Sequence, residues 1–302
     1  MQRRVVSTIG CVRVVITGGA GFIGRHLVQR YVDSGHETLI VDDLSTSSAQ
    51  DLPDGVELIQ ADVADPATGL QLARARPDVV IHAAAQVSVS HSLRNPKRDR
   101  EINIVGTENV LHGARRARRF VFISSGGAVY GEAVTAREDD PARPVNFYGV
   151  HKWTAERYVM LSGLPYAIAR PSNVYGPGQR SDIEGGVVAI FCERARRRQP
   201  LLIYGDGEQC RDFIHVNDVV SAIAAMVDTR RVGTWNVGTG VATSVNELAS
   251  LVEGARGEEL ERERLPPRPG DVRLSTMNIS AAMAQLGWRP NIGLADGLQD
   301  LV

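Results

Sequence analysis

Three glycines in the stretch "VVITGGAGFIG" have the spacing of a phosphate-binding turn. Gly18, Gly21 and Gly24 follow an apolar, β-branched run and open a segment with helical periodicity. Glycines at these positions permit a tight turn and let backbone N–H groups approach a pyrophosphate at the N-terminus of the helix. Because a strand pattern precedes the turn and a helical pattern follows it, the motif predicts dinucleotide binding.

Two carboxylates further along the chain have positions that suit the rest of such a cofactor. Asp42 comes 18 residues after Gly24, at the end of the second apolar run. A carboxylate there accepts hydrogen bonds from the ribose hydroxyls and repels a 2′-phosphate, which favours NAD over NADP. Asp62, in "IQADVAD", is expected to bind the adenine amino group, with an acid near the start of the next helix as the alternative.

A tyrosine and a lysine in "FYGVHKWTAE" supply groups for proton transfer. Tyr148 and Lys152 are four residues apart, so they share one face of a helix. Tyrosine alone is a poor base because its unperturbed pKa is about 10. A lysine ammonium one turn away, together with a positively charged nicotinamide, is expected to lower that pKa. Tyr148 would then take a proton from a substrate hydroxyl while a hydride leaves the same carbon for NAD+.

Short apolar runs and helical patterns alternate around these residues and must position them. The runs predict buried parallel strands at Val12–Ile16, Glu37–Val41, Val56–Gln60, Val79–Ile81, Arg119–Ile123 and Tyr166–Arg170. Helical periodicity covers Phe22–Ser34, Pro66–Arg76, Pro96–Ala117 and Tyr148–Ser162. This alternation predicts right-handed crossovers and a doubly wound parallel α/β sheet of the Rossmann type.

The pattern becomes less regular after about residue 172, where a smaller α/β substrate-binding lobe is expected to begin. The predicted division is therefore 1–172 for the NAD-binding Rossmann domain and 173–302 mainly for the second lobe. Val187–Gln199 is expected to be helical. Phe213–Val216 and Thr234–Val237 are expected to return to the first lobe as late strands, near residues 210–240.

Composition excludes several classes of protein. The chain of 302 residues has a formal net charge of −1, which gives no reason to expect nucleic acid or a membrane as partner. Its arginine-rich runs, 115–119 and 194–198, each end a predicted helix, where cations oppose the helix dipole. Three cysteines without a C-x-x-C pair argue against disulfides and a zinc site, so no metal is expected. With no signal peptide or membrane span in the sequence, a cytoplasmic location is predicted.

Taken together, these motifs resemble the extended short-chain dehydrogenase/reductase family, the NAD-dependent sugar-nucleotide epimerases and dehydratases. The resemblance covers nearly the whole chain and is strongest to the UDP-glucose (UDP-galactose) 4-epimerases. Besides Y-x-x-x-K, it rests on TGGAGFIG, HAAAQ, NIVGT, VYG, RPSNVYGPGQ, GDGEQCRDFIHVNDVV, NVGTG, RPGD and LGWRP.

The resemblance implies a role for each of two sets of residues. Tightly bound NAD would contact Gly18, Gly21, Phe22, Ile23, Gly24, Asp42, Asp43, Ser45, Thr46, Asp62, Val63, Ala83, Ala84, Ala85, Asn103, Ser124, Tyr148, Lys152 and Pro171. The sugar nucleotide, held largely by the second lobe, would contact Ser125, Gly126, Tyr148, Asn173, Arg180, Val187, Val188, Leu202, Tyr204, Arg211, Arg268 and Asp271. Within that set, Tyr204 would stack on the base, and Arg211 and Arg268 would clamp the diphosphate, for which guanidinium groups are suited.

The implied reaction is 4-epimerisation. Tyr148 would remove the 4-hydroxyl proton, the bound 4-keto sugar would turn over, and hydride would return to its other face. Relatives that dehydrate their substrate carry an acid and a base where this chain has Gly127 and Ala128, and decarboxylases carry a glutamate at the latter position. Both reactions are therefore disfavoured.

One catalytic position departs from the family pattern. Counting back from "VYG", the serine or threonine that bonds the sugar 4-hydroxyl falls on Gly126, so Ser124 and Ser125 are one or two places early. Ser125 or an ordered water would take the missing role; the alternative is that Tyr148 acts alone.

The sugar itself stays open. A neutral hexose, UDP-glucose or UDP-galactose, is favoured. UDP-glucuronate is the alternative, because Arg180 resembles an arginine that meets the C6 carboxylate in UDP-glucuronate epimerases; otherwise Arg180 would face water or a neighbouring acid such as Asp182. A non-catalytic NAD-binding scaffold or sensor and a net reductase remain as other classes, and a homodimer is expected from the resemblance alone.

Overall fold

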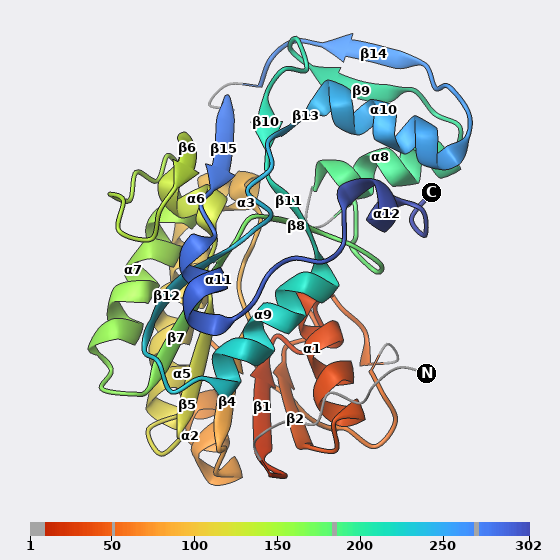
Figure 1. Cartoon of the computed structure of the whole chain (residues 1–302). Coiled ribbons are helices and arrows are strands. Elements are labelled where there is room, and N and C mark those ends of the chain that lie inside the picture. The colour runs from red at the N-terminus through yellow and green to blue at the C-terminus, as the bar shows by residue number, and fades with distance from the viewer. Residues whose placement is uncertain (1–9, 50–51, 183–185, 269–271) are drawn as a thin grey trace.

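A seven-stranded parallel sheet forms the centre of the larger lobe (Figure 1). The computed structural model describes residues 10–49, 52–182, 186–268 and 272–302. From one edge to the other the strands are β12 (Gly233–Val237), β7 (Tyr166–Pro171), β5 (Arg119–Ile123), β4 (Val79–His82), β1 (Arg13–Thr17), β2 (Glu37–Asp42) and β3 (Glu57–Gln60). The order reverses between β1 and β4. A crevice for ligands therefore opens at the carboxyl ends of these two strands.

Helices cover both faces of this sheet, which confirms the predicted doubly wound α/β fold. One face packs against α1 (Phe22–Asp33), α9 (Val216–Asp228) and α11 (Ser280–Leu286). The other packs against α2 (Pro66–Ala75), α5 (Gly106–Gly113) and α7 (Phe147–Leu161). Because both faces are covered, the strands are nearly continuous apolar runs, as the residues of β5 illustrate, all of them buried.

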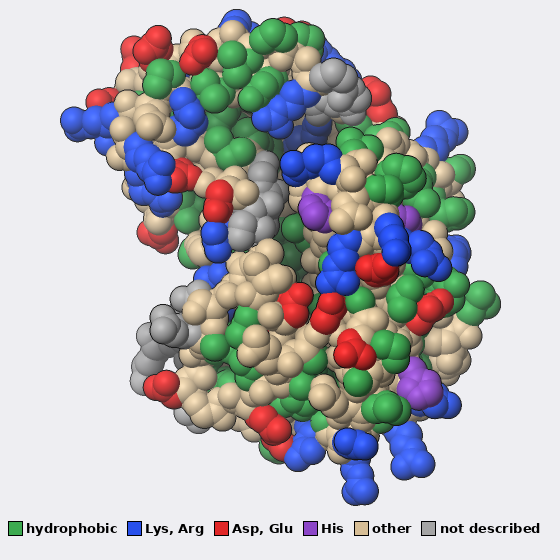
Figure 2. All heavy atoms as spheres, turned by 180° about the vertical axis from the view of Figure 1, so that it is seen from behind, with side chains coloured by type: hydrophobic (Ala, Val, Ile, Leu, Met, Phe, Trp, Pro, Cys, Tyr) green, Lys and Arg blue, Asp and Glu red, His purple; other side chains and the backbone are tan. Residues whose placement is uncertain are grey.

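A smaller lobe with its own core stands beyond the carboxyl ends of the strands (Figure 1). Its core brings together α8 (Val187–Arg196), β9 (Leu201–Tyr204), α10 (Val245–Arg256), β11 (Phe213–His215) and α12 (Leu294–Leu298). Strand β9 pairs with β14 (Arg262–Leu265), and β11 pairs with β8 (Asn173–Tyr175). Seen from behind, the surface is hollowed between this lobe and the larger one (Figure 2).

A four-stranded sheet links the two lobes. Its order is β13 (Thr243–Ser244), β10 (Cys210–Arg211), β15 (Leu274–Met277) and β6 (Ala133–Ala136). Helix α6 (Gly126–Tyr130) lies between β5 and β6 in the chain. The division near residue 172 stays a prediction. Three elements beyond that residue, α9, β12 and α11, pack with the first lobe, so the boundary in the sequence does not separate the two lobes cleanly.

Two expectations about single elements need correction. The helix predicted over Pro96–Ala117 is three pieces, α4 (Pro96–Arg100), the π-helical turn η2 (Glu101–Val105) and α5, preceded by α3 (Val89–Arg94). The wider turn inserts an extra residue that periodicity does not register. Thr234–Val237 does join the main sheet as β12, whereas Phe213–Val216 does not, because β11 pairs with β8 instead.

In the arginine run at 115–119, predicted to be a solvated helix end, the arginines are exposed except for the last. Arg115, Arg116 and Arg118 are exposed, but Arg119 is buried and donates to the Met226, Tyr166 and Arg231 carbonyls. Lys and Arg side chains project from the lower end of the molecule in Figure 2. Within the part of the chain that the structure describes, no helix is long and apolar enough to cross a membrane.

Candidate active site

The glycine turn between β1 and α1 forms the floor of the site. Gly18 has φ = 68°, and a Cβ there would lie 2.5 Å from the Ala84 backbone nitrogen. A Cβ on Gly24 would lie 1.9 Å from the Gly18 carbonyl oxygen. No side chain fits at either position, so the backbone and the N-terminus of α1 stay open to an anionic ligand.

A cavity of about 340 Å³ opens over this turn at the carboxyl ends of the strands. It is lined by every predicted cofactor residue except Asn103, together with Ser125. It is also lined by residues that the sequence reasoning did not assign: Val41, Ala61, Gln86, Val87, Ser88, Ile102, Ile123, Ser172, Val174 and Gln179. Gln86 and Gln179 are the last residues of the motifs HAAAQ and RPSNVYGPGQ, and their place in these motifs could have indicated that they line the cavity. The shape and the glycine cradle fit a dinucleotide.

The two predicted acids are both in this cavity but in different settings. Asp42 is buried; its Oδ2 accepts from the Ala20 N–H and its Oδ1 from the Leu44 N–H, each at 2.9 Å. These bonds fix the carboxylate at the end of β2. Asp62 accepts from the Ala64 N–H and forms an ion pair with Arg98 at 2.5 Å. Part of its hydrogen-bonding capacity is therefore already used within the protein.

Asn103 does not line the cavity, and its predicted contact with NAD stays a prediction. Its side chain brackets the backbone of Gln86, donating to the Gln86 carbonyl at 3.0 Å and accepting from the Gln86 N–H at 3.2 Å. Only 1% of Asn103 is exposed. It therefore acts on the cofactor site through the loop after β4, because it holds that loop in place.

Helix α7 places Tyr148 and Lys152 in the cavity wall, one turn apart. The helix starts at the Asn146 cap, whose side chain accepts from the Gly149 N–H at 2.9 Å. The pKa of Tyr148 is raised to about 12, chiefly by burial and to a smaller extent by the charge of Asp99, while the nearby Ser125 side chain lowers it. Burial lowers the pKa of Lys152 to about 7, against the influence of Glu156 and Asp99.

Lys152, together with a charged nicotinamide, was expected to lower the pKa of Tyr148. Among the protein groups, burial dominates and raises that pKa. The expectation for the complex with NAD stays a prediction. The Lys152 ammonium lies 4.3 Å from the centroid of the Phe122 ring, in an apolar setting that disfavours its charge.

The two neighbouring serines at the end of β5 have separate partners. Ser124 lines the cavity, and its buried hydroxyl donates to Glu156 Oε1 at 2.6 Å. Ser125 lines the cavity, and its side chain lies near enough to Tyr148 to lower the pKa of that phenol. The structure therefore supplies a hydroxyl beside Tyr148 from Ser125, in spite of its offset from the family register.

Gly126 does not line the cavity, so its predicted substrate contact is not found. It begins α6, and a Cβ there would lie 2.4 Å from Met277 Sδ and 3.3 Å from the Arg170 carbonyl oxygen. A side chain at this position would point into the packing of α6 against β15. Its glycine is therefore a packing requirement.

A smaller cavity of about 180 Å³ adjoins the first through the shared residues Val174 and Gln179. Three predicted substrate residues line it: Asn173, Val187 and Val188. The two cavities lie between the lobes, where a substrate bound in one would meet Tyr148 in the other.

The other predicted substrate residues that the structure describes line neither cavity. Leu202 and Tyr204 are on β9, and Arg211 is on β10. The Arg268 guanidinium lies 3.8 Å from the centroid of the Tyr204 ring, a cation–π contact. Asp271 lies outside the described residues.

Arg180 makes an ion pair with Asp182, Nη2 to Oδ2 at 2.7 Å, and also donates to the Thr46 carbonyl. Half of its side chain is exposed, and it lines neither cavity. Arg180 was expected to meet a substrate carboxylate, water or a neighbouring acid, and the structure shows the pair with the acid Asp182.

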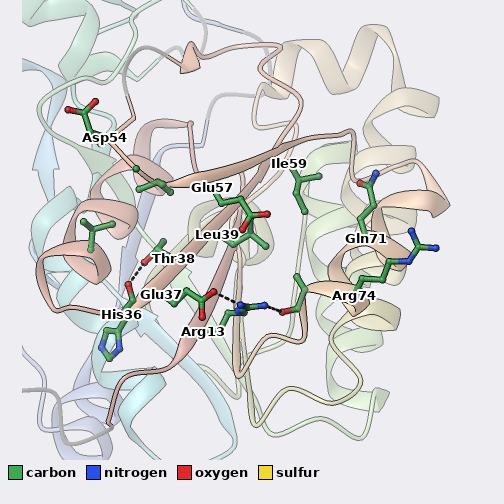
Figure 3. Close-up of a pocket in the computed structure, with 14 residues that line it drawn as sticks. Arg13, His36, Glu37, Thr38, Leu39, Asp54, Glu57, Ile59, Gln71 and Arg74 are labelled. Atoms are coloured by element: carbon green, nitrogen blue, oxygen red, sulfur yellow. Dashed lines mark hydrogen bonds and ion pairs between the residues drawn. The ribbon is translucent and has the colours of Figure 1, made fainter.

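A separate cavity of about 720 Å³ lies at the opposite end of the sheet (Figure 3). Its residues include Arg13 and Glu37, which begin β1 and β2 and form an ion pair, and Arg13 donates to the Ala75 carbonyl at 2.7 Å. The amino ends of these strands are a sheet's length from Tyr148, so this cavity takes no part in the site. Among the described residues, no group of three His, Cys, Asp or Glu is arranged to hold a metal ion.

The fold and the paired Tyr148 and Lys152 beside a dinucleotide cavity define a nucleotide-dependent α/β enzyme of the short-chain dehydrogenase type. Residues 14–238 match the NAD dependent epimerase/dehydratase family. The chain belongs to this family, which confirms the resemblance of its motifs.

Several known proteins similar to this chain over most of its length are sugar-nucleotide epimerases, and UDP-glucuronic acid decarboxylases of Arabidopsis thaliana are also similar to it, at 32% identity over 96% of this chain. The UDP-glucose 4-epimerase of Mycolicibacterium smegmatis is 41% identical over 305 residues, 96% of this chain and 97% of that protein. A crystal structure of a Thermotoga maritima UDP-glucose 4-epimerase with UDP-glucose is 37% identical and has a TM-score of 0.92, covering 96% and 97% of the two chains. A Bacillus cereus UDP-glucuronic acid 4-epimerase variant, bound to a fluorinated UDP-glucuronic acid and NAD, has a TM-score of 0.87 at 27% identity, covering 96% and 97%.

Proposed function

We propose that this protein is an NAD-dependent 4-epimerase of a nucleotide sugar that interconverts UDP-glucose and UDP-galactose. One observation carries the proposal: Tyr148 and Ser125 both line the dinucleotide cavity, which adjoins the pocket of Asn173. The geometry thus offers one proton-transfer group at one cofactor. Epimerisation at a carbon bearing a hydroxyl requires no more.

The residues have distinct roles in this reaction. The residues of the glycine turn and the cavity wall would hold NAD, which would supply the acceptor and donor of a hydride at C4 of the sugar. Tyr148 takes the proton of the 4-hydroxyl and gives it back, and Ser125, near the tyrosine, orients that hydroxyl. Lys152 lies one turn away and supports the ionised tyrosine when it carries its own proton. Between the two transfers, the 4-keto sugar turns over about its diphosphate.

The acidic and basic side chains that elimination and decarboxylation would require are absent at Gly127 and Ala128. Gly127 and Ala128 are in α6 and have no titratable atom. Loss of water across C5 and C6 needs an acid and a base beside the reacting carbons. The proposal therefore keeps the reaction redox-neutral, with NAD retained through the cycle.

The test is product analysis with purified protein. It is incubated with UDP-glucose, UDP-galactose, UDP-glucuronate and UDP-N-acetylglucosamine in separate reactions, and the products are resolved by chromatography. We expect the UDP-glucose and UDP-galactose reactions to reach the same mixture without added NADH. Dependence of turnover on NADH would instead indicate a net reductase, and no conversion of any sugar would favour an NAD-binding scaffold.

UDP-glucuronate is the second candidate substrate. The choice between it and a neutral sugar depends on whether Arg180 pairs with the C6 carboxylate. The ion pair with Asp182 uses the guanidinium within the protein, which favours the neutral sugar. If UDP-glucuronate is converted and Arg180→Ala abolishes that conversion while sparing UDP-galactose, the uronic acid assignment holds. Equal effects of Arg180→Ala on both sugars would exclude a pairing with the carboxylate.

The protein is also proposed to act as a homodimer through α7. Five large side chains of this helix are exposed, Phe147, Val150, Trp153, Tyr158 and Leu161. Several exposed apolar groups on one helix are typical of an interaction surface. We expect a dimer by light scattering and a monomer for Val150→Glu combined with Leu161→Glu; Val134→Glu, at an exposed position on β6, is the control.

A cytoplasmic location is part of the proposal. Cys11, Cys192 and Cys210 are free thiols, which suits a reducing compartment. Fractionation of cells that produce the protein, with soluble and membrane markers, tests it.

A further inference from the structure

Asp99 is a buried carboxylate to which the reaction above gives no role. It lies on α4 and has no exposed surface. Its Oδ2 is 2.5 Å from Nδ1 of His151 on α7, and its Oδ1 accepts from Nε2 of Gln86 at 2.5 Å. Both oxygens are therefore used, as a charge removed from water requires. The three side chains join α4, α7 and the loop after β4.

At one end of this series of hydrogen bonds, Gln86 belongs to the wall of the cofactor cavity. Gln86 lines the cavity, and its backbone is bracketed by Asn103. Its amide group bonds Ser88 twice, accepting from the Ser88 N–H at 2.6 Å and donating to the Ser88 carbonyl at 3.0 Å. With Asp99 as a further partner, the loop has little freedom to move away from α4.

At the other end of these hydrogen bonds, His151 belongs to α7, the helix that carries the proton-transfer groups. His151 lies three residues after Tyr148 and directly before Lys152 on α7. Its ring stacks on Phe147 with centroids 6.1 Å apart, which limits its rotation. A displacement of His151 relative to Asp99 would therefore move Tyr148 and Lys152 relative to the cavity wall.

The charge of Asp99 also reaches the proton-transfer pair. It favours the protonated forms of both Tyr148 and Lys152, whose pKa values it raises. Other groups face these two residues. Glu156 on α7 raises the pKa of Lys152, and that lysine helps keep the buried His82 of β4 neutral.

The neighbouring cation does not cancel the charge of Asp99. Arg98, the preceding residue, is paired with Asp62 at 2.5 Å and with Glu101 at 3.5 Å. Its guanidinium is thus directed to other carboxylates.

We propose that Asp99 and His151 are positioning residues, whose buried hydrogen bond holds α7, with Tyr148 and Lys152, in register with the Gln86 wall of the cofactor cavity. The inference rests on the proposed function, since it concerns the proton transfer by Tyr148. The geometry has two consequences: the bond sets the distance between cofactor and tyrosine, and the carboxylate makes Tyr148 harder to ionise.

The first experiment tests the hydrogen bond with two variants of His151. His151→Asn keeps a donor near the position of Nδ1, whereas His151→Leu leaves Asp99 without that partner. For His151→Leu we expect kcat for UDP-galactose to fall about tenfold, because misplacement of reacting groups slows the chemical step. KM should change less than about twofold, since substrate contacts persist. The fraction of NAD retained through gel filtration should fall, and His151→Asn should restore both values.

If His151→Leu has the kcat and NAD retention of the wild type and only a lower Tm, the proposal is overturned. Asp99 and His151 then form a structural contact only. If the wild-type protein converts no UDP-sugar, the proposed function fails, but NAD retention in the two His151 variants still decides whether the pair holds the cavity.

The second experiment tests the charge. Asp99→Asn keeps the shape and can bond both partners, with His151 in its other tautomer, but it removes the negative charge. Loss of that charge makes the ionised tyrosine more favourable, so the acidic limb of the kcat–pH profile should move to lower pH by roughly one unit. Asp218→Asn makes the same change at another buried carboxylate, which caps the Asn291 and Ile292 N–H groups, and should leave the limb in place. An unmoved limb in Asp99→Asn would contradict the charge effect.

Discussion

Arg170 and Glu156 form a buried ion pair, with Nη2 2.6 Å from Oε2 and Nε 2.9 Å from Oε1. Glu156 is one turn beyond Lys152 on α7, and Arg170 is on β7, so the pair fixes the helix to the sheet. The Ser124 hydroxyl donates to the same carboxylate. The position of Tyr148 and Lys152 thus depends on a charge pair that is closed to solvent.

Removal of Glu156 is expected to destabilise the protein severely. Glu156→Ala leaves Arg170 charged and uncompensated in the interior, which costs about 3–5 kcal/mol of unfolding free energy. Urea denaturation measures the loss. Asp206→Asn is the control, because its pair with Arg273 is 56% exposed on both sides and should contribute little. Similar losses for the two variants would contradict the role given to Glu156.

Loss of the Ser125 hydroxyl should reduce catalysis less than loss of the tyrosine hydroxyl. Tyr148→Phe is expected to lower kcat by about 10²–10⁴-fold, because it removes the proton-transfer group. Ser125→Ala removes the hydroxyl near that group and should cost about tenfold. Initial rates with UDP-galactose measure both. Tyr130→Phe, a buried tyrosine bonded to Asn236 and Arg170, is the matched control, which should lose stability and keep its kcat. Unchanged kcat in Ser125→Ala would assign the role to Tyr148 alone.

The stability of the protein should rise with pH because of Lys152. Its pKa in the folded state is about 7, below the ordinary lysine value of 10.5, so between these values the unfolded chain binds a proton that the folded chain does not. The unfolding free energy then increases with pH by up to about 1.4 kcal/mol per unit in this window. Below pH 7 both states are protonated and this slope vanishes. Lys152→Met should lack the slope, which is obtained as the difference between wild-type and variant urea curves at several pH values. A flat difference from pH 7 to 10 would contradict burial of the neutral amine.

The preference for NAD should depend on Asp42. Asp42→Asn keeps an acceptor for only one of the Ala20 and Leu44 N–H groups, which bond different oxygens of Asp42, and it removes the charge that repels a 2′-phosphate. We expect the ratio of NADP to NAD dissociation constants to fall about tenfold, as loss of one charge repulsion implies. Calorimetric titration of both nucleotides measures this ratio. Asp43→Asn, the neighbouring acid that bonds Ser45, is the comparison, and an equal change there would place the discrimination elsewhere.

The sequence by itself predicted the elements and motifs whose contacts are local. Arg119–Ile123 is a strand with the predicted bounds, and Gly18, Gly21 and Gly24 lie where a strand meets a helix. Tyr148 and Lys152 share a helix face because four residues make about one turn. In each case the cause lies within a few residues along the chain, so periodicity and spacing reveal it.

The tertiary structure alone decided which side chain meets which. Gly126 is constrained by Met277, and Asn103 by the loop of Gln86, both distant in sequence. The π turn before α5 and the pairing of β11 with β8 likewise left no local signal. The pKa of Tyr148 is set by burial, which depends on packing of the whole domain. Sequence spacing determined which groups are available for chemistry, whereas long-range packing determined their partners and their charge, because desolvation and contact across elements are properties of the folded chain.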